Sequence, residues 1–396
     1  MTGVRARLLD AYCHGYDPGD LGLGGFEALL PGEAAPGTTL FDSPAGYAVR
    51  RWCPPLLGLE PHCPPARYLA RRRELGAFQA VRLLLRGAGI AGYVVDSGEP
   101  GGLASAKELA EAAGAPAGEA VRLEPLIQQV ADTSGTVDAF LANLAEAVHS
   151  AAPAATALCL DGALPCGGVP GTPAFPAGSV EPALPGAAAL GEPGCGSGCG
   201  CGGAGDTGPP GPLDVRRAAG RWLAVRRVRE RPADPVLLRH LRWQAVAAGL
   251  PLLLRYPCGG PGPGADAAFL RAAAGLGADV VLLPPARHEA AAALLAAQLP
   301  HVHVAVGGDP SAVLASTPFG KVLYGSGAAG LPELHVAAAG GFRVGLGRLV
   351  AERVAAGEWS RADGERVTSL VCAGNAARLF PQAATAPGAA RRPLTG

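Results

Sequence analysis

Several side chains that could carry chemistry follow short apolar runs in this sequence. Tyr12, Cys13 and His14 come directly after one such run, and Arg255 and Cys258 stand at the end of another. Imidazole and thiol groups bind metals or move protons, whereas a guanidinium group binds anions and cannot be a metal ligand. The adjacent Cys13 and His14 do not predict a catalytic dyad, because neighbours on a strand point to opposite faces.

The apolar runs that precede these side chains have the character of buried strands. Eight of them can be identified, at 7–11, 92–96, 156–161, 221–226, 251–256, 279–284, 301–306 and 321–326. They are almost continuously apolar, which is typical of parallel strands that are covered on both faces. Helical patterns lie between them, at 65–89, 136–150, 234–249 and 286–299.

Strands that alternate with helices indicate βαβ units, and eight strands favour a closed (β/α)8 TIM barrel, an α/β fold. An open doubly wound sheet is the alternative, but GEPGGLAS at 98–105, after the second run, does not match G-x-G-x-x-G, and no Walker sequence occurs. Chemistry in a barrel lies at the C-terminal ends of the strands, so the strand-end side chains are the candidates. Arg255 would be confined there and needs a partner, either an anionic ligand or a buried carboxylate.

The composition argues against several classes of function. Lys+Arg and Asp+Glu are equal at 33 each, which gives no electrostatic argument for nucleic acid or for an anionic membrane. The N-terminus lacks the apolar region of a signal peptide, and no stretch approaches the roughly 18 apolar residues of a membrane span. We predict a cytoplasmic protein that takes a small-molecule substrate or ligand, and a homo-oligomer is left open.

Two segments depart from the barrel pattern. Residues 162–213 are rich in Gly and Pro and poor in charge, and residues 382–396 are also of low complexity. Such segments cannot bury enough apolar surface to offset their ordering entropy. We predict a barrel of residues 1–381, interrupted by a disordered insertion at 162–213 and followed by a disordered tail at 382–396. CGSGCGC at 195–201 lacks paired C-x-x-C units, which favours loop cysteines over a zinc site.

Longer segments of the chain resemble a known family. YCHGYDPGD near the start, residues 25–61, residues 238–254 and the block HVHVAVGGDPSAVLASTPFGKVLYGSGAAGLPELH at 301–335 are similar to the amidohydrolase superfamily. The similar branch comprises metal-dependent hydrolases that also occur fused to glutamine-synthetase-like domains. The resemblance covers most of the chain outside the insertion and the tail. It implies a (β/α)8 barrel and, in active members, metal-assisted hydrolysis of C–N or related bonds.

The same resemblance implies that most metal ligands have been replaced. The family carries H-x-H after the first strand, single histidines after the fifth and sixth, and an aspartate after the eighth. Here the pair is Tyr12 and His14, the fifth-strand position is Arg255, and the eighth-strand position is Gly327. No histidine occupies the sixth-strand position, although His288 follows a few residues later. Tyr12-Cys13-His14 therefore looks like the remnant of a metal site.

Two hypotheses follow for the function. The first is an amidohydrolase-like hydrolase that uses a partial or rebuilt metal site, with zinc as the divalent metal if the family chemistry survives. The alternative is a non-catalytic barrel, a pseudoenzyme that binds a small anionic ligand or a partner protein. The candidate metal ligands are His14, Cys258 and His288. The candidate ligand-binding residues are Tyr12, Arg255 and Glu333, the last of which could equally interact with a helix dipole.

Overall fold

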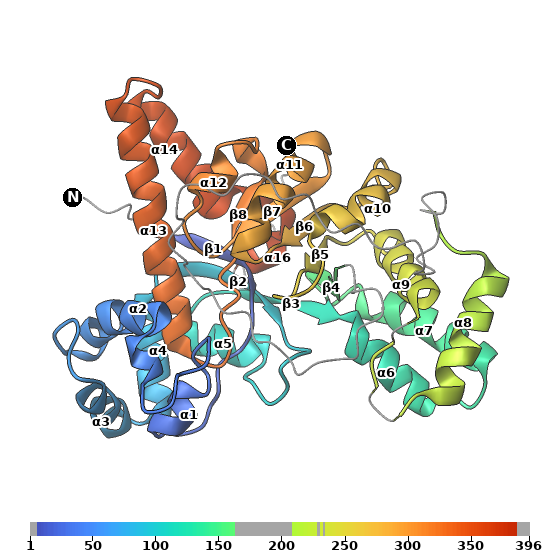
Figure 1. Ribbon diagram of the computed structural model, residues 1–396, viewed down its shortest axis with the longest axis horizontal. Helices are drawn as coiled ribbons and strands as arrows, with labels where there is room; N and C mark the ends of the chain where they lie inside the picture. The colour runs from blue at the N-terminus through green and yellow to red at the C-terminus, as the bar shows by residue number, and fades with distance from the viewer. Residues whose placement is uncertain (1–5, 163–207, 228–229, 233, 386–396) are drawn as a thin grey trace, which may run out of the picture.

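Eight parallel strands form the centre of the molecule. The computed structural model describes residues 6–162, 208–227, 230–232 and 234–385 (Figure 1). The strands are β1 Leu8–Cys13, β2 Ile90–Asp96, β3 Ala117–Arg122, β4 Ala157–Asp161, β5 Leu252–Arg255, β6 Val280–Leu283, β7 Val302–Val306 and β8 Val322–Tyr324. They follow one another around the sheet in sequence order. The chain after β8 returns to β1, where the Gly327 amide donates to the Tyr12 carbonyl oxygen at 2.9 Å.

Helices surround the barrel, and α1–α4 gather on one side of it while α6–α9 lie on the opposite side (Figure 1). The first group of α-helices is α1 Leu23–Glu27, α2 Pro44–Trp52, α3 Pro65–Leu75, α4 Ala77–Gly87, α5 Ala106–Ala113, α6 Leu123–Thr133, α7 Val137–Ala151 and α8 Pro212–Val225. The second group is α9 Pro235–Ala247, α10 Ala267–Ala272, α11 Glu289–Gln298, α12 Ser311–Leu314, α13 Pro332–Ala355, α14 Arg361–Ser369, α15 Asn375–Leu379 and α16 Pro381–Ala384. Short helical turns are η1 Leu40–Asp42, η2 Pro54–Leu57, η3 Pro263–Asp266, η4 Ala286–His288, η5 Phe319–Lys321 and the π-helical η6 Leu370–Gly374.

The predicted (β/α)8 barrel is confirmed, with one strand assigned wrongly. The run at 221–226 is not a strand, because residues up to Val225 belong to α8, whose buried side chains include Trp222. The third strand is instead β3, which the sequence pattern did not reveal. Its sequence AGEAVR is only half apolar, and its first three residues are not buried. A buried-strand pattern cannot appear in a strand that is covered only near its end.

The predicted helices are present with altered ends. The pattern at 65–89 is divided between α3 and α4, which meet at Gly76 with a φ of 78°, a conformation that favours glycine. The Thr136 side chain accepts a hydrogen bond from the Ala139 amide and caps α7, as predicted. The predicted insertion lies mostly outside the described residues, which resume at Gly208. Helix α16 extends into the predicted tail as far as Ala384.

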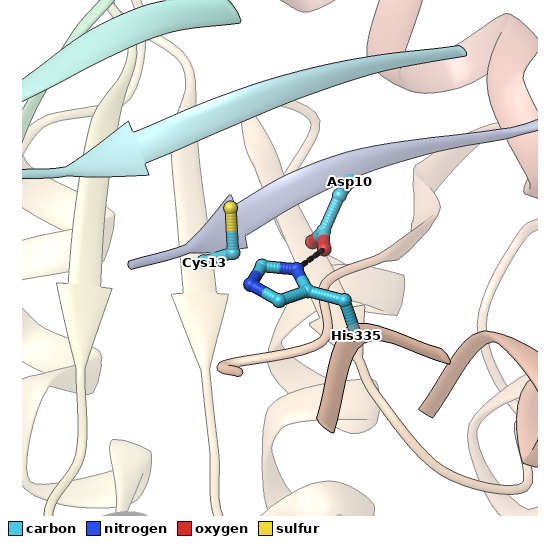
Figure 2. A group of neighbouring side chains, drawn as sticks. All are labelled: Asp10, Cys13 and His335. Atoms are coloured by element: carbon cyan, nitrogen blue, oxygen red, sulfur yellow. Dashed lines mark ion pairs between the residues drawn. The ribbon is translucent and has the colours of Figure 1, made fainter. Parts of the chain in front are cut away.

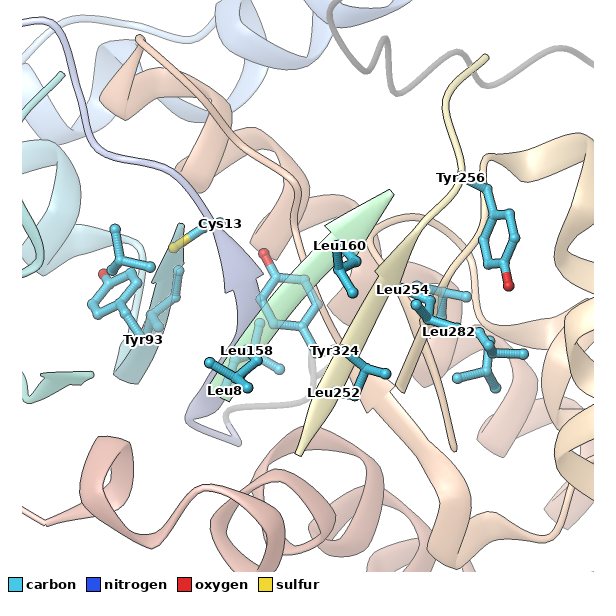
Figure 3. Packing of buried hydrophobic residues seen from close by; sticks show 14 of the residues in the cluster. Leu8, Cys13, Tyr93, Leu158, Leu160, Leu252, Leu254, Tyr256, Leu282 and Tyr324 are labelled. Carbon is cyan, nitrogen blue, oxygen red and sulfur yellow. The ribbon is translucent and has the colours of Figure 1, made fainter. Parts of the chain in front are cut away.

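Strand β1 carries an irregularity that decides which side chains face the barrel interior. Its register with β2 shifts between Asp10 and Cys13. Ala11 and Tyr12 both belong to the apolar cluster inside the barrel, whereas Cys13 belongs to the outer cluster between strands and helices (Figure 3). Two successive inward residues are typical of a β-bulge. The bulge therefore turns both Asp10 and Cys13 outward, towards α13.

The N-terminal end of the barrel is closed by the last two described helices. Leu379 of α15, Phe380 at the junction of the two helices and Ala383 of α16 belong to the interior cluster, together with Leu9 and Val94 from the strands. Gly92 of β2 allows this approach, because a Cβ there would come within 2.0 Å of the Ala383 carbonyl oxygen. The opposite, C-terminal end of the barrel is thus the end at which polar side chains can gather.

Candidate functional site at the mouth of the barrel

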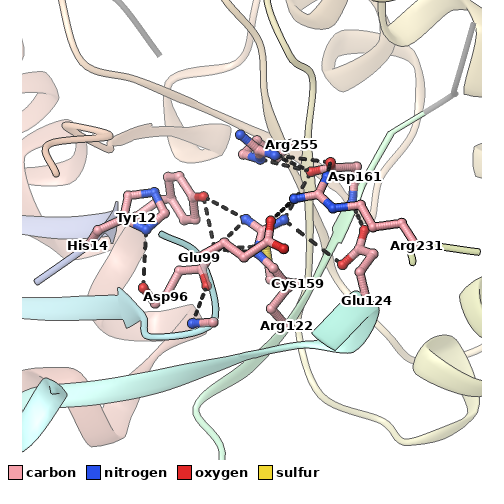
Figure 4. A network of polar contacts seen from close by, with 11 residues as sticks. Tyr12, His14, Asp96, Glu99, Arg122, Glu124, Cys159, Asp161, Arg231 and Arg255 are labelled. Atoms are coloured by element: carbon pink, nitrogen blue, oxygen red, sulfur yellow. Dashed lines mark hydrogen bonds and ion pairs between the residues drawn. The ribbon is translucent and has the colours of Figure 1, made fainter. Parts of the chain in front are cut away.

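Five polar side chains meet at the C-terminal ends of the first five strands (Figure 4). Tyr12 comes from β1, Asp96 ends β2, Arg122 ends β3, Asp161 ends β4 and Arg255 ends β5. Each lies at the C-terminal end of its strand, and the strand fixes where its side chain begins. We call these five residues the mouth network.

Arg122 lies at the centre of the mouth network, with only 1% of its side chain exposed. Its Nε donates to Asp96 Oδ2 at 2.9 Å, and its Nη1 donates to Asp161 Oδ1 at 3.0 Å. Its Nη2 also donates to Asp96 and to the Tyr12 hydroxyl oxygen. The Tyr12 hydroxyl in turn donates to Asp96 Oδ2 at 3.0 Å. A buried guanidinium is stable only with such partners, so the network is held by its own ion pairs.

Arg255 has a carboxylate partner rather than requiring a ligand. Its Nε and Nη2 donate to the two oxygens of Asp161 at 2.8 and 3.0 Å, which is a bidentate pair. Arg231 approaches from the segment before α9, with Nη1 3.4 Å from Asp161 Oδ2, and forms an ion pair with Glu99. Nη1 of Arg255 has no protein acceptor among the described residues.

Burial and charge perturb the acidic groups of the network in opposite directions. Burial alone would raise the pKa of Asp96, but the Arg122 guanidinium holds that pKa below its usual value. Glu124 lies behind Asp161 and accepts a hydrogen bond from the Asp161 amide at 2.5 Å. Burial, together with the Asp161 charge, raises the pKa of Glu124 to about 7. One carboxyl beside the network therefore changes its protonation near neutral pH.

His14 lies beside the network as a neutral imidazole. Its Nδ1 is 3.1 Å from the Asp96 carbonyl oxygen, and its ring meets that of Tyr12 edge-on at 5.1 Å. Burial lowers the pKa of His14 to about 4, and the neighbouring guanidinium groups of Arg122 and Arg255 act in the same direction.

The mouth network does not fit the divalent metal that the family resemblance implies. Of the two first-strand ligand positions, Tyr12 and His14, only His14 is an imidazole, and the fifth-strand position is Arg255. The Tyr12 hydroxyl is engaged by Asp96 and by the Arg122 guanidinium, and Arg255 offers no lone pair. Two fixed cations within the same network would repel a third. We derive no catalytic step through a metal at this position.

The other sequence-predicted residues lie apart from the mouth network. Cys258 is exposed, and His288 accepts a hydrogen bond at Nε2 from Arg287. Glu333 is buried at the start of α13, where it pairs with Arg72 and accepts from the Tyr68 hydroxyl at 2.8 Å. Among the described residues, three potential metal ligands converge in one place only, at Asp10, Cys13 and His335. That group does not include His14, Cys258 or His288.

Several residues of the site were missed by sequence reasoning although a signal existed. Asp96 and Asp161 are the final letters of the runs GYVVD and TALCLD, so both were visible as acids at strand ends. Arg122 was hidden because its strand was not identified. Glu124 follows two residues later, at the start of α6. Its role depends on burial, which the sequence does not display.

Comparison with solved structures places this fold among known proteins. A protein of Lactobacillus casei assigned as a metal-dependent hydrolase superimposes with a TM-score of 0.71, at 16% identity over 95% of each chain. Uronate isomerase of Bacillus halodurans superimposes with a TM-score of 0.54, at 11% identity over 95% of this chain and 94% of that one. Glucuronate isomerase of Caulobacter crescentus superimposes with a TM-score of 0.54, at 12% identity over 96% of this chain and 92% of that one. The chain shares the fold of these proteins.

Sequence comparison adds no further match. No protein-family model matches the chain, and no curated protein matches it. Within the described part of the chain, every helix is too short or too polar to cross a membrane.

Proposed function

We propose that the protein is a hydrolase that cleaves a C–N or related bond of a small molecule at the mouth of its barrel. The observation that carries this proposal is the mouth network, in which buried guanidinium groups and carboxylates meet at the strand ends where such barrels perform chemistry. Perturbed ionisable groups gathered in one place are typical of functional sites. The fold shared with a protein assigned as a metal-dependent hydrolase supports the same reaction class.

Guanidinium groups would supply the positive charge that a metal supplies in other hydrolases. As water attacks the carbonyl carbon of the substrate, negative charge develops on the carbonyl oxygen. Nη1 of Arg255 donates no hydrogen bond to any described protein group, so it can donate one to that oxygen. A preorganised donor that meets developing charge lowers the barrier.

The Asp161–Glu124 pair would handle the proton. Because burial raises the pKa of Glu124 to about 7, its carboxyl group takes up a proton readily near neutral pH. The attacking water loses its proton to the pair while the new C–O bond forms. The same proton passes to the leaving nitrogen as the C–N bond breaks, so the carboxyl groups end as they began.

The substrate class that suits this site carries a carboxylate. Uronate isomerases, by their name, act on sugars that bear such a group. Arg255 of the mouth network and Arg231 beside it are partly exposed, with 17% and 45% of their side chains accessible. Arginine binds a carboxylate with matching planar geometry.

The proposal predicts a hydrolytic activity that depends on Glu124. N-acetyl amino acids combine an amide bond with a carboxylate, and release of the free amine from a panel of them measures turnover. Glu124→Gln should reduce the rate by about 10²–10⁴-fold, because the proton acceptor is lost. The wild-type rate should rise as the pH increases through about 7, since the base must be ionised.

The matched control for this experiment is Glu111→Gln, which changes an exposed acid on α5 and should leave the rate unchanged. All proteins are dialysed against a chelator beforehand, so that the rate reports the chain's own groups. Equal rates for the wild type and Glu124→Gln would contradict the proposal. Binding of the same compounds without turnover would favour the alternative of a non-catalytic barrel.

A further inference from the structure

A second cluster of reactive side chains lies on the outer side of β1, away from the mouth network. Asp10 and Cys13 come from β1, and His335 comes from the first turn of α13 (Figure 2). All three are completely buried, and their potential ligand atoms lie within 4.8 Å of one another. The β1 bulge makes this possible, because residues three apart on a regular strand would point to opposite faces.

The charge of Asp10 has no positive partner in this cluster. Its carboxylate accepts hydrogen bonds from the Ser326 amide at 2.8 Å and from the Ser326 hydroxyl at 2.6 Å. Among the described residues, its single ion-pair candidate is His335, whose Nδ1 lies 3.9 Å from Oδ2. At 3.9 Å these two groups are too far apart to share a hydrogen bond. A carboxyl group buried here ionises only at a cost, which a bound cation would compensate.

The His335 imidazole has no side-chain hydrogen-bond partner among the described residues. Both of its ring nitrogens are buried, and the backbone of His14 is the polar group that interacts with the ring. Buried polar groups in native proteins are nearly always well satisfied, so an imidazole with so few partners beside a carboxyl group and a thiol is a candidate ligand. The hydroxyls of Tyr93 and Tyr324 are buried and unsatisfied as well. The Tyr93 ring lies 5.9 Å from that of His335, which places a further oxygen donor in the same layer.

We propose that Asp10, Cys13 and His335 bind a structural zinc ion between β1 and α13. One sulfur, one nitrogen and one oxygen ligand form a mixed set that suits zinc, whereas calcium and magnesium require oxygen ligands. Two ligands of a tetrahedral zinc with bonds near 2 Å lie about 3.3 Å apart, so the 3.9 Å between Asp10 and His335 needs only a small contraction. A water molecule or a tyrosine hydroxyl completes the four positions.

Binding of zinc at this place would join the first strand to the long helix α13. The Cys13 thiol, which donates to the Val94 carbonyl oxygen at 3.6 Å, would lose its proton to become a thiolate ligand. Because the cluster is closed to solvent, the metal must enter as the chain folds. The site is separate from the mouth network, and it stands whether or not the protein is a hydrolase.

The test is refolding of the full chain with zinc or with a chelator, followed by elemental analysis. We expect about one zinc per chain after refolding with zinc, and a lower melting temperature after refolding with the chelator. Refolding with Co²⁺ should give the near-ultraviolet absorption of a cobalt–thiolate bond, which reports Cys13 directly. Cys13→Ser should abolish that absorption, and both Cys13→Ser and His335→Gln should retain less than about a tenth of the zinc.

Two control variants keep the result specific. Cys372→Ser changes another buried free thiol, and His14→Gln changes the histidine beside the mouth network. Both should keep the zinc and the cobalt absorption. Wild type that takes up neither metal on refolding would overturn the proposal, even if a ligand variant failed to fold. Zinc that is lost in His14→Gln and kept in Cys13→Ser would place the metal at the mouth instead.

Discussion

Replacing Arg122 with Met is expected to lower the free energy of unfolding by about 3–5 kcal/mol, because it breaks a buried ion-pair network from its centre. Asp96 is fully buried and would keep only uncharged partners among the described residues, which are the Gly98 amide, the Tyr12 hydroxyl and the Cys159 thiol. Asp161 would still be paired with Arg255. The loss therefore falls on Asp96, whose charge would be left without a cation.

Urea denaturation of the wild type and Arg122→Met measures this loss. The matched control is Arg216→Met, which breaks an exposed ion pair with Asp138 and should cost less than about 1 kcal/mol. Adding Asp96→Asn to Arg122→Met should recover part of the stability, since the unpaired charge is then removed. If both variants lost a similar amount of unfolding free energy, the buried network would stabilise the protein no more than an exposed ion pair does.

The same comparison has a defined dependence on pH. The pKa of Asp96 is depressed in the folded protein, so its contribution is present above the ordinary value of 3.8 and is lost as the pH falls below it. The difference in stability between the wild type and Arg122→Met should therefore shrink in acid. Denaturation series at pH 7 and in acid distinguish this charge effect from a loss of packing.

Phe380→Ala is expected to cost about 3–5 kcal/mol, because it opens a cavity where α15 and α16 close the barrel. The Phe380 side chain is completely buried among interior residues of the strands. No neighbour can easily replace it, since the strands around it are held in their parallel register. The effect is expected on stability and not on the chemistry at the opposite end.

The control for this change is Phe78→Ala on α4, where the ring is 60% exposed. Its removal should cost less than about 1 kcal/mol, as is usual for surface positions. Chemical denaturation of both variants gives the comparison. If Phe380→Ala were as stable as Phe78→Ala, the helices at the bottom of the barrel would not be part of its core.

Most of the barrel could be predicted because its strands are buried on both faces. Runs such as DVVLLP and HVHVAV are almost continuously apolar and leave little choice of structure. β3 was missed for the opposite reason, since AGEAVR is covered only near its end. The run at 221–226 was predicted as a strand because it is short and mostly apolar. The spacing of its apolar residues also fits the buried face of α8.

The sequence predicted where the candidate site lies, but not most of the residues that form it. The position of Tyr12 and Arg255 at strand ends follows from the barrel, and both belong to the mouth network. Their partners Asp96 and Asp161 lie far from them in sequence, and no local pattern connects such residues. The cluster of Asp10, Cys13 and His335 was harder still to predict, because it depends on a β-bulge that shifts the register of β1 against β2.

The closure of the barrel by α15 and α16 has a consequence for how this chain is made. The ribosome delivers all eight strands before it delivers Phe380, so the nascent barrel is first open to water at its N-terminal end. Apolar interior residues such as Leu9 and Val94 stay exposed there until the final helices arrive. A growing chain at this stage exposes apolar surface that is prone to aggregation, and the barrel can be closed at this end only after α15 and α16 have been synthesised.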